Sequence, residues 1–176
     1  MGAELPHKKV KLVIPALYSN MIMLSKAEAR LVKLFGNIDY KSSSYPFNYT
    51  DYYTREMGSS INRIFFAFKR LIEAEDLVQI KKDTNLIELK LSINGSRTVN
   101  LDPGYLELGK FVLATTKDQQ HRLYMGDGIY EEITLYFKNR EWRHWDWTYP
   151  DYRSLLYREI LLKIRELYKK QIKELS

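Results

Sequence analysis

The chain has no cysteine and no long apolar run, and these two absences exclude several classes of protein. Disulfide scaffolds, zinc fingers, iron–sulfur proteins and cysteine nucleophiles all need residues that are missing. No stretch reaches the roughly 18 apolar residues of a membrane-spanning helix. The N-terminal segment lacks an apolar stretch followed by a small-residue cleavage site, so it predicts no secretory signal. We therefore expect a cytoplasmic protein without a membrane partner.

The signature motifs of several enzyme classes are absent as well. The sequence has no GxxxxGK[ST] phosphate loop, no GxGxxG fingerprint, no HExxH motif and no GxSxG elbow. Of its three histidines, His7 and His144 lie far from any metal-ligand spacing. The sequence therefore disfavours ordinary GTPases, Rossmann dehydrogenases, zinc proteases and serine hydrolases.

What is present fits one globular domain spanning residues 1–176. Hydrophobic residues make up 45% of the chain and charged residues 28%, which is enough to build a core. The formal net charge is +6, and residues 152–176 carry seven bases against three acids. Such a basic segment either contacts phosphates or forms a solvated helix face, and the sequence leaves both interpretations open.

The hydrophobic periodicity predicts an α+β fold, with a largely antiparallel sheet, helices packed on one face and a long C-terminal helix. Strands are expected at 9–17, 38–41, 61–69, 98–101, 121–125 and 129–137, and helices at 25–35, 73–82, 105–115 and 148–174. The segment 84–101 fits either a hairpin turning at Asn94-Gly95 or an extension of the preceding helix. We favour the hairpin.

Four segments carry a resemblance to a known family. They are FNYTDYYTREMG (47–58), VNLDPGY (99–105), ATTKDQQHRLY (114–124, continuing to 132) and WTYPDY (147–152). Together they resemble the bacterial family known as domain of unknown function 4416, over nearly the whole chain. Some members of that family are labelled GTP-binding proteins, but the resemblance implies no established activity.

The polar members of these segments form the candidate site. Carboxylates beside a histidine divide acid and base roles or bind a divalent metal, whereas Lys and Arg clamp phosphates. The predicted catalytic residues are Asp51, Glu56, Asp102, His121 and Glu131, with Glu132 as the alternative to Glu131. The predicted ligand-binding residues are Lys117, Arg122 and Tyr124. A divalent metal is a candidate cofactor to which no ligand set is assigned.

Each candidate also has a purely structural interpretation. Asp102 precedes Pro103 and would cap the helix expected after it. The loop carboxylates would only pin their loop, and the histidine would be structural. Glu131 falls on the apolar face of its predicted strand, where a buried carboxylate needs a partner. The candidate partners are Lys117, His121 and Arg122.

Three functions follow from these observations. The favoured one is a small enzyme or binding protein that acts on a nucleotide-like or phosphorylated ligand through the carboxylate, His, Lys and Arg cluster. The first alternative is a non-catalytic RNA-binding module that uses the basic C-terminal helix and the aromatic stretch 142–147, whose rings would stack on bases. The second is a protein-interaction scaffold. The sequence assigns no reaction and no oligomeric state.

Overall fold

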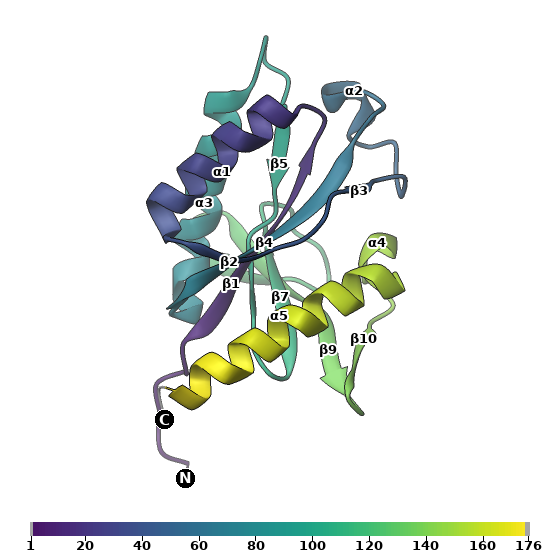
Figure 1. Cartoon of the computed structure of the whole chain (residues 1–176). Coiled ribbons are helices and arrows are strands. Elements are labelled where there is room, and N and C mark those ends of the chain that lie inside the picture. Colours follow the sequence, from purple (N-terminus) through teal and green to yellow (C-terminus); the bar gives the residue numbers. More distant parts are fainter. Residues whose placement is uncertain (1, 175–176) are drawn as a thin grey trace.

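A computed structural model describes residues 2–174 and confirms the α+β class (Figure 1). In chain order the elements are β1 (Val10–Tyr18), α1 (Met21–Phe35), β2 (Ile38–Lys41), β3 (Tyr45–Pro46), α2 (Thr54–Met57), β4 (Asn62–Ile72), a 3₁₀ turn η1 (Ala74–Asp76), α3 (Leu77–Leu91), β5 (Val99–Leu101), β6 (Gly104–Leu106), β7 (Lys110–Thr115), β8 (Leu123–Gly126), β9 (Ile129–Lys138), β10 (Glu141–His144), α4 (Pro150–Arg153) and α5 (Leu155–Glu174).

The described strands form one antiparallel sheet, and β1 is its branching point. The main strand order is β10-β9-β7-β6-β1-β4-β2, with β3 beside β4, β5 beside β1 and β8 beside β9. One edge of β1 pairs with β4, whereas the other edge pairs with β5 over residues 16–18 and with β6 over residues 11–13. The sheet therefore splits between β5 and β6, at Asp102 and Pro103. The N–H of Asp102 donates to the carbonyl of Pro15 there.

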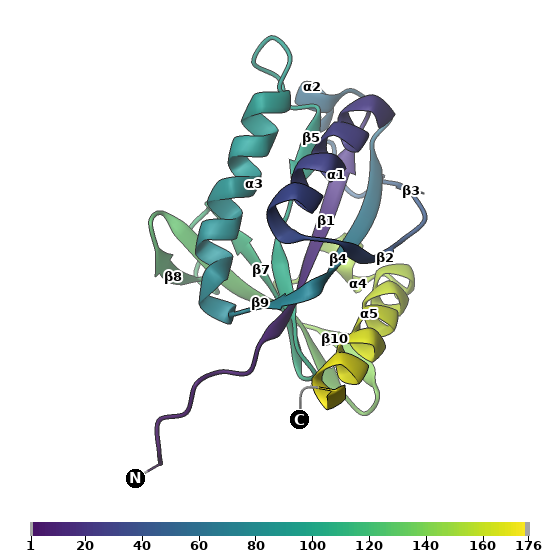
Figure 2. The same cartoon turned by 60° about the vertical axis from the view of Figure 1, so that its left-hand side comes forward.

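Helices cover both faces of this sheet rather than one. The strand β4 carries Ile64, Phe66 and Phe68 on the face beneath α1 and α3, and Phe65 and Ala67 on the face beneath α5. Figures 1 and 2 show α1 and α3 side by side on the first face and α5 across the second. A strand that is apolar on both sides needs two covering layers, and a one-sided arrangement would leave large apolar side chains in water.

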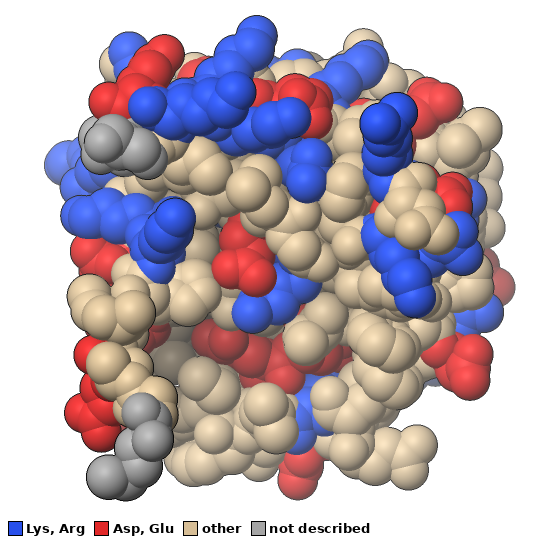
Figure 3. Space-filling view, turned by 90° about the horizontal axis from the view of Figure 1, so that it is seen from below, with Lys and Arg blue, Asp and Glu red and all other residues tan. Residues whose placement is uncertain are grey.

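The long C-terminal helix is confirmed, with a break at Ser154 that separates α4 from α5. The inner side of α5 buries Tyr157, Ile160 and Ile164 against the sheet. Viewed from below, Lys and Arg side chains gather along the edge that α5 forms (Figure 3). Within residues 2–174 no helix is both long enough and apolar enough to cross a membrane.

A buried lysine fixes α5 to the central strand. The Lys11 side chain of β1 has no exposed surface, and its ammonium donates to the Asp39 carboxylate, the Phe68 carbonyl and Oε1 of Gln171 on α5, at 2.6, 2.9 and 2.7 Å. Burial lowers the pKa of Lys11, although Asp39 opposes the effect. All three donors of the ammonium are used, so this lysine has a structural role.

The segment 84–101 is helical at its start, so the hairpin prediction is wrong and the alternative is right. Helix α3 continues to Leu91, and only residues 93–96 form a tight turn. The alternation of apolar residues that favoured a strand is incidental. Ile87 and Leu91 are buried at a helical spacing of four, whereas Leu89 between them is 70% exposed.

The helix predicted at 105–115 is also wrong, because these residues form the antiparallel pair β6 and β7. Gly104 explains the difference. A Cβ atom at this position would lie 2.2 Å from the carbonyl oxygen of Val112, so the glycine permits a close approach of β7. Helix α1 begins at Met21, four residues before the predicted start, because Asn20 caps it through the N–H groups of Ile22 and Met23.

Candidate functional site

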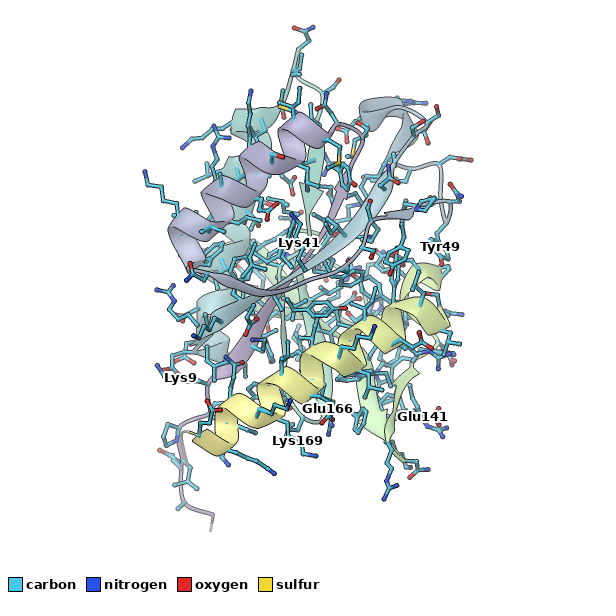
Figure 4. All side chains as sticks on the ribbon, viewed as in Figure 1. Lys9, Lys41, Tyr49, Glu141, Glu166 and Lys169 are labelled. Atoms are coloured by element: carbon cyan, nitrogen blue, oxygen red, sulfur yellow. The ribbon has the colours of Figure 1, made fainter. Side chains whose placement is uncertain are left out.

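A cleft of about 540 Å³ opens where the sheet splits. Its walls come from the loop 47–53, from β4, from the inner side of α3, from β5 and its following turn, from the end of β7, and from the segment 149–152. Tyr49 reaches from the loop 47–53 toward α5 (Figure 4), with its ring centroid 6.1 Å from that of Tyr157. Segments far apart in the sequence therefore share one cavity.

The lining of the cleft is charged and aromatic. Its basic residues are Arg63, Lys81, Arg97, Lys117 and Arg122; its acidic residues are Glu88, Asp102, Glu132 and Asp151; and its aromatic residues are Phe47, Tyr49, Tyr52, Tyr53, Tyr149 and Tyr152. Buried charges are costly unless they are paired, so the partner of each charged group decides what the cleft can still bind.

Arg63 holds two carboxylates together at the inner wall. This arginine on β4 is 3% exposed, and its two terminal nitrogens each donate at 3.1 Å, one to Asp102 and the other to Asp151. Burial acts to raise the pKa of both carboxyl groups, but the net shifts differ. The pKa of Asp102 is lowered, because the charges of Arg63 and Lys81 outweigh burial. The pKa of Asp151 is raised, because burial outweighs the charge of Arg63. The pair therefore combines an ionised carboxylate with one that takes up a proton more readily.

Two lysines line the cleft without a carboxylate partner. Lys81 on α3 is 7% exposed, and its ammonium donates to the carbonyl of Leu101 at 3.0 Å. Lys117, in the loop after β7, donates to the hydroxyl of Tyr52 at 3.0 Å and lies 4.3 Å from the centroid of that ring. The hydrogen bond from Lys117 lowers the pKa of Tyr52. Among the described residues no carboxylate lies within 4.0 Å of either ammonium, so both retain donors for a ligand.

A second arginine cluster closes the side of the cleft near β9. The Arg122 guanidinium donates to Glu132 at 2.7 Å, to the Lys117 carbonyl at 2.9 Å and to the Tyr149 hydroxyl at 3.0 Å. His121 lies 3.1 Å from the same Glu132 oxygen. These contacts fix the loop that carries Lys117. Arg122 therefore positions Lys117, and most hydrogen-bond donors of the Arg122 guanidinium are already used within the protein.

The third arginine joins α3 to α2. Arg97 donates to Glu56 through two nitrogens, at 2.9 and 2.5 Å, and to the Asn100 side-chain oxygen at 2.8 Å. Glu88 lies 3.6 Å from Arg97 and accepts the N–H of Leu101 at 2.6 Å. Burial raises the pKa of Glu88 despite the nearby Lys81 charge. The deep end of the cleft is thus a network of paired polar groups. Lys81 differs from the arginines in this network, because no carboxylate of the described residues lies within 4.0 Å of its ammonium.

Five of the predicted site residues belong to this region. Asp102, Lys117 and Arg122 line the cleft directly. Glu56 and His121 lie one contact behind the lining, on Arg97 and Glu132 respectively. Asp102 caps no helix, because a strand follows it, and its carboxylate instead faces Arg63.

The other three predicted residues lie outside the lining. Asp51 is exposed in the loop 47–53, and its carbonyl accepts the N–H of Thr54. Tyr124 is 62% exposed on β8, where its ring packs on Tyr130. Glu131 is on the face of β9 opposite to Glu132 and does not line the cleft, and the partners expected for it cluster around Glu132 instead.

Glu131 is a buried carboxylate with an unused oxygen. Its Oε1 atom has no hydrogen-bond partner, and burial raises its pKa to about 7, with the charge of Lys110 opposing the effect. On β9 it lies two residues after Ile129, which belongs to the core beneath α1 and α3. The one-residue step from Glu131 to Glu132 moves the side chain to the other face of the strand.

Sequence reasoning missed Arg63, Lys81, Glu88, Arg97 and Asp151. Lys81 and Glu88 share the inner stripe of α3, and that stripe is visible only when residues 77–91 are taken as one helix. Asp151 matched a helix-start pattern, which hid its pairing with Arg63. Arg63 at the start of the apolar run of β4 was the one direct signal, since buried arginines require partners.

No preformed metal centre is found in the part of the chain that the structure describes. Within residues 2–174, no three His, Asp or Glu side chains are placed to hold a metal ion.

Comparison with known proteins identifies a family. A family model described as "Domain of unknown function (DUF4416)" matches residues 8–168. The match includes every strand of the sheet and all the residues that line the cleft. No curated protein and no solved structure matches the chain.

Proposed function

The chain belongs to the DUF4416 family, and we propose that its cleft binds a small anionic molecule with a flat ring system, such as a nucleotide or another phosphorylated compound. The observation that carries this proposal is that Lys81 and Lys117 line one cavity and that, within residues 2–174, neither ammonium has a carboxylate within 4.0 Å. A buried ammonium with unused donors is costly in an empty cleft, and an anionic ligand would remove that cost.

The size and lining of the cleft suit such a ligand. A volume of about 540 Å³ lies within the range of roughly 300–1,000 Å³ typical of small-molecule sites. Phe47, Tyr49 and Tyr53 pack edge to face or tilted on one side, so their rings are held in fixed orientations for stacking. Lys81 lies at the deep end and Lys117 lies beside the exposed Tyr52, so two anionic groups or one extended phosphate chain would be bound.

Turnover of that ligand is a second candidate function, favoured by the carboxylate pair on Arg63. Asp102 and Asp151 share one guanidinium, and their pKa values are shifted in opposite directions. Pairs of this kind divide general base and general acid roles. Substitution of Asp102 or Asp151 by Asn would then abolish product formation and leave ligand binding within about threefold, as followed by phosphorus NMR.

The RNA-binding alternative has less support from the tryptophan segment. Trp142 is 2% exposed, and Trp145 and Trp147 stack on each other with centroids 5.1 Å apart. His121 also stacks on Trp147, with ring centroids 5.4 Å apart. Trp147 keeps 40% of its surface exposed, but Trp142 is buried and the other rings already stack on protein rings, so packing explains most of the segment.

The experiment that tests the proposal is a calorimetric titration with defined probes. The probes are ATP, GTP, AMP, ribose 5-phosphate and inorganic phosphate, each also tested by thermal unfolding because a ligand of the native state raises the melting temperature. The variants are Lys81→Met and Lys117→Ala, and the control is Lys82→Met, which removes a neighbouring charge that pairs with Asp127 outside the cleft.

We expect at least one probe to bind, and each cleft variant to weaken that probe about tenfold or more. The control variant should bind like the natural chain. Lys81→Met keeps its packing volume, so its melting temperature reports whether it still folds. Absence of binding by every probe, or an affinity in both cleft variants equal to that of the natural chain, would refute the proposal.

A further inference from the structure

A second hollow, separate from the cleft, lies between α1 and α3. It is a groove of about 550 Å³ that shares no lining residue with the cleft. The two helices run side by side on the face of the sheet opposite to α5 (Figure 2). The groove follows α1 from Met23 to Lys33 and is bounded on the other side by residues 90–93, at and just after the C-terminal end of α3. It belongs to no part of the proposed small-molecule site.

The charged residues that line the groove are all basic. Lys26, Arg30 and Lys33 follow one side of α1 at a spacing of four and three residues, and Lys90 faces them from α3. None of these four side chains has a hydrogen bond or ion pair with another described residue. Four cations without a counter-charge around one hollow make a local positive field that attracts an anionic partner.

The floor and rim of the groove are apolar and aliphatic. Met23, Ala29, Leu91 and Ile93 line it, and Ile93 is 48% exposed. One turn before Lys26, Ile22 is 65% exposed on the same side of α1. Isolated exposed aliphatic residues are ordinary on a protein surface, but Ile93 lies in a groove that bases flank, and Ile22 lies outside the lining, one turn before Lys26.

We propose that this groove binds an acidic amphipathic helix of a protein partner. A groove between two helices with an apolar floor accepts the apolar side of a third helix. The three bases of α1 extend over about 10 Å, or two helical turns, which matches carboxylates spaced at four and three residues on a partner helix. The lining contains no aromatic residue for stacking on bases.

The test uses defined probes and fluorescence anisotropy. The main probe is a labelled peptide of about 15 residues, with Leu on one helical side and Glu flanking it. Its control has the same composition in an order that destroys the apolar side. Oligouridine and vesicles of anionic phospholipid probe the two other polyanions that four bases could attract.

Two groove variants and one matched control locate the binding site. Lys26→Glu with Lys33→Glu reverses two charges of α1, and Ile93→Asp places a charge on the apolar rim. The control, Lys169→Glu with Lys170→Glu, reverses two exposed lysines on α5; Lys169 projects from the outer side of that helix (Figure 4). All these side chains are largely exposed, so the variants are expected to fold, and thermal unfolding verifies it.

We expect the amphipathic peptide to bind, with a loss of about tenfold or more in both groove variants and less than about twofold in the control variant. Binding should weaken as salt is raised from about 50 to about 300 mM. Equal binding of the rearranged peptide would overturn the proposal, as would preferential binding of oligouridine or vesicles, or no loss in the groove variants. Because the cleft is untouched, its ligand binding should be unchanged in every variant, which separates this proposal from the proposed function.

Discussion

The buried Glu131 makes stability depend on pH in a direction that can be worked out. Burial raises its pKa from 4.5 to about 7 in the folded chain. The folded chain therefore favours the protonated carboxyl group. The contribution of Glu131 to the free energy of unfolding is fully present at pH values below the pKa of this group in the unfolded chain, and it is lost as the pH rises through about 7. The difference between the two pKa values corresponds to about 3 kcal/mol, on the order of a quarter to a half of the stability of an ordinary domain.

Glu131→Gln removes this titration and nearly preserves the shape of the side chain. At about pH 5 the variant and the natural chain should have similar free energies of unfolding, because the natural carboxyl is then mostly protonated when folded. At about pH 8 the variant should be more stable by about 1–3 kcal/mol, the lower value allowing for the cost of burying an amide. Glu131→Leu serves as a second variant without a polar group.

Urea unfolding at several pH values measures the effect. The informative quantity is the difference in free energy of unfolding between variant and natural chain, since other titrating groups cancel in it. A difference that stays flat between about pH 5 and pH 8, or a glutamine variant that is the less stable protein at about pH 8, would show that Glu131 is solvated or paired. Tyr105 offers an independent check, because burial and Glu131 together raise its pKa to about 12.

Three further predictions concern the fold. Arg63→Met leaves two carboxylates without their shared partner and should cost about 3–5 kcal/mol of stability at neutral pH. Urea unfolding measures this loss, which should shrink in acid as the two carboxylates become protonated. An unchanged free energy of unfolding would contradict the prediction. Gly104→Ala places a Cβ against the carbonyl of Val112 and should cost about 1–3 kcal/mol of stability, measured as a lower melting temperature. A melting temperature that rises instead would show that β7 moves away to accommodate the methyl group. Asn20→Ala removes two capping hydrogen bonds and should cost about 1 kcal/mol by the same assay, whereas no change would mean that solvent replaces the cap.

The sequence predicted the fold class and the elements with regular patterns. The alternation in β1 and β4 and the hairpin of β8 and β9 around residues 126–128 follow from local rules. It failed in the second half of α3. The apolar residues at 87, 89 and 91 alternate with polar ones, so a helix was mistaken for a strand, and tertiary packing overrode the local pattern.

The candidate site was predictable only in part, because convergence in space leaves no mark on the local sequence. Asp102, Lys117 and Arg122 are polar residues in distinctive segments, and these three line the cleft. Arg63 lies 39 and 88 residues from the carboxylates that it joins. The pairing of β4 and β5 with β1 brings Asp102 to it, and the packing of α4 on the sheet brings Asp151. The roles of the cleft residues stay predictions until a ligand is identified.

The attachment of α5 to β1 through Lys11 and Gln171 has a consequence for biosynthesis. The two residues are separated by 160 positions, so this contact forms only after every strand has been translated. Until then one side of the sheet, with Phe65 and Phe111, remains open to water and to chaperones. A ribosome-bound chain that stops before residue 155 should therefore be degraded readily by protease, and release of the full helix should confer protection abruptly.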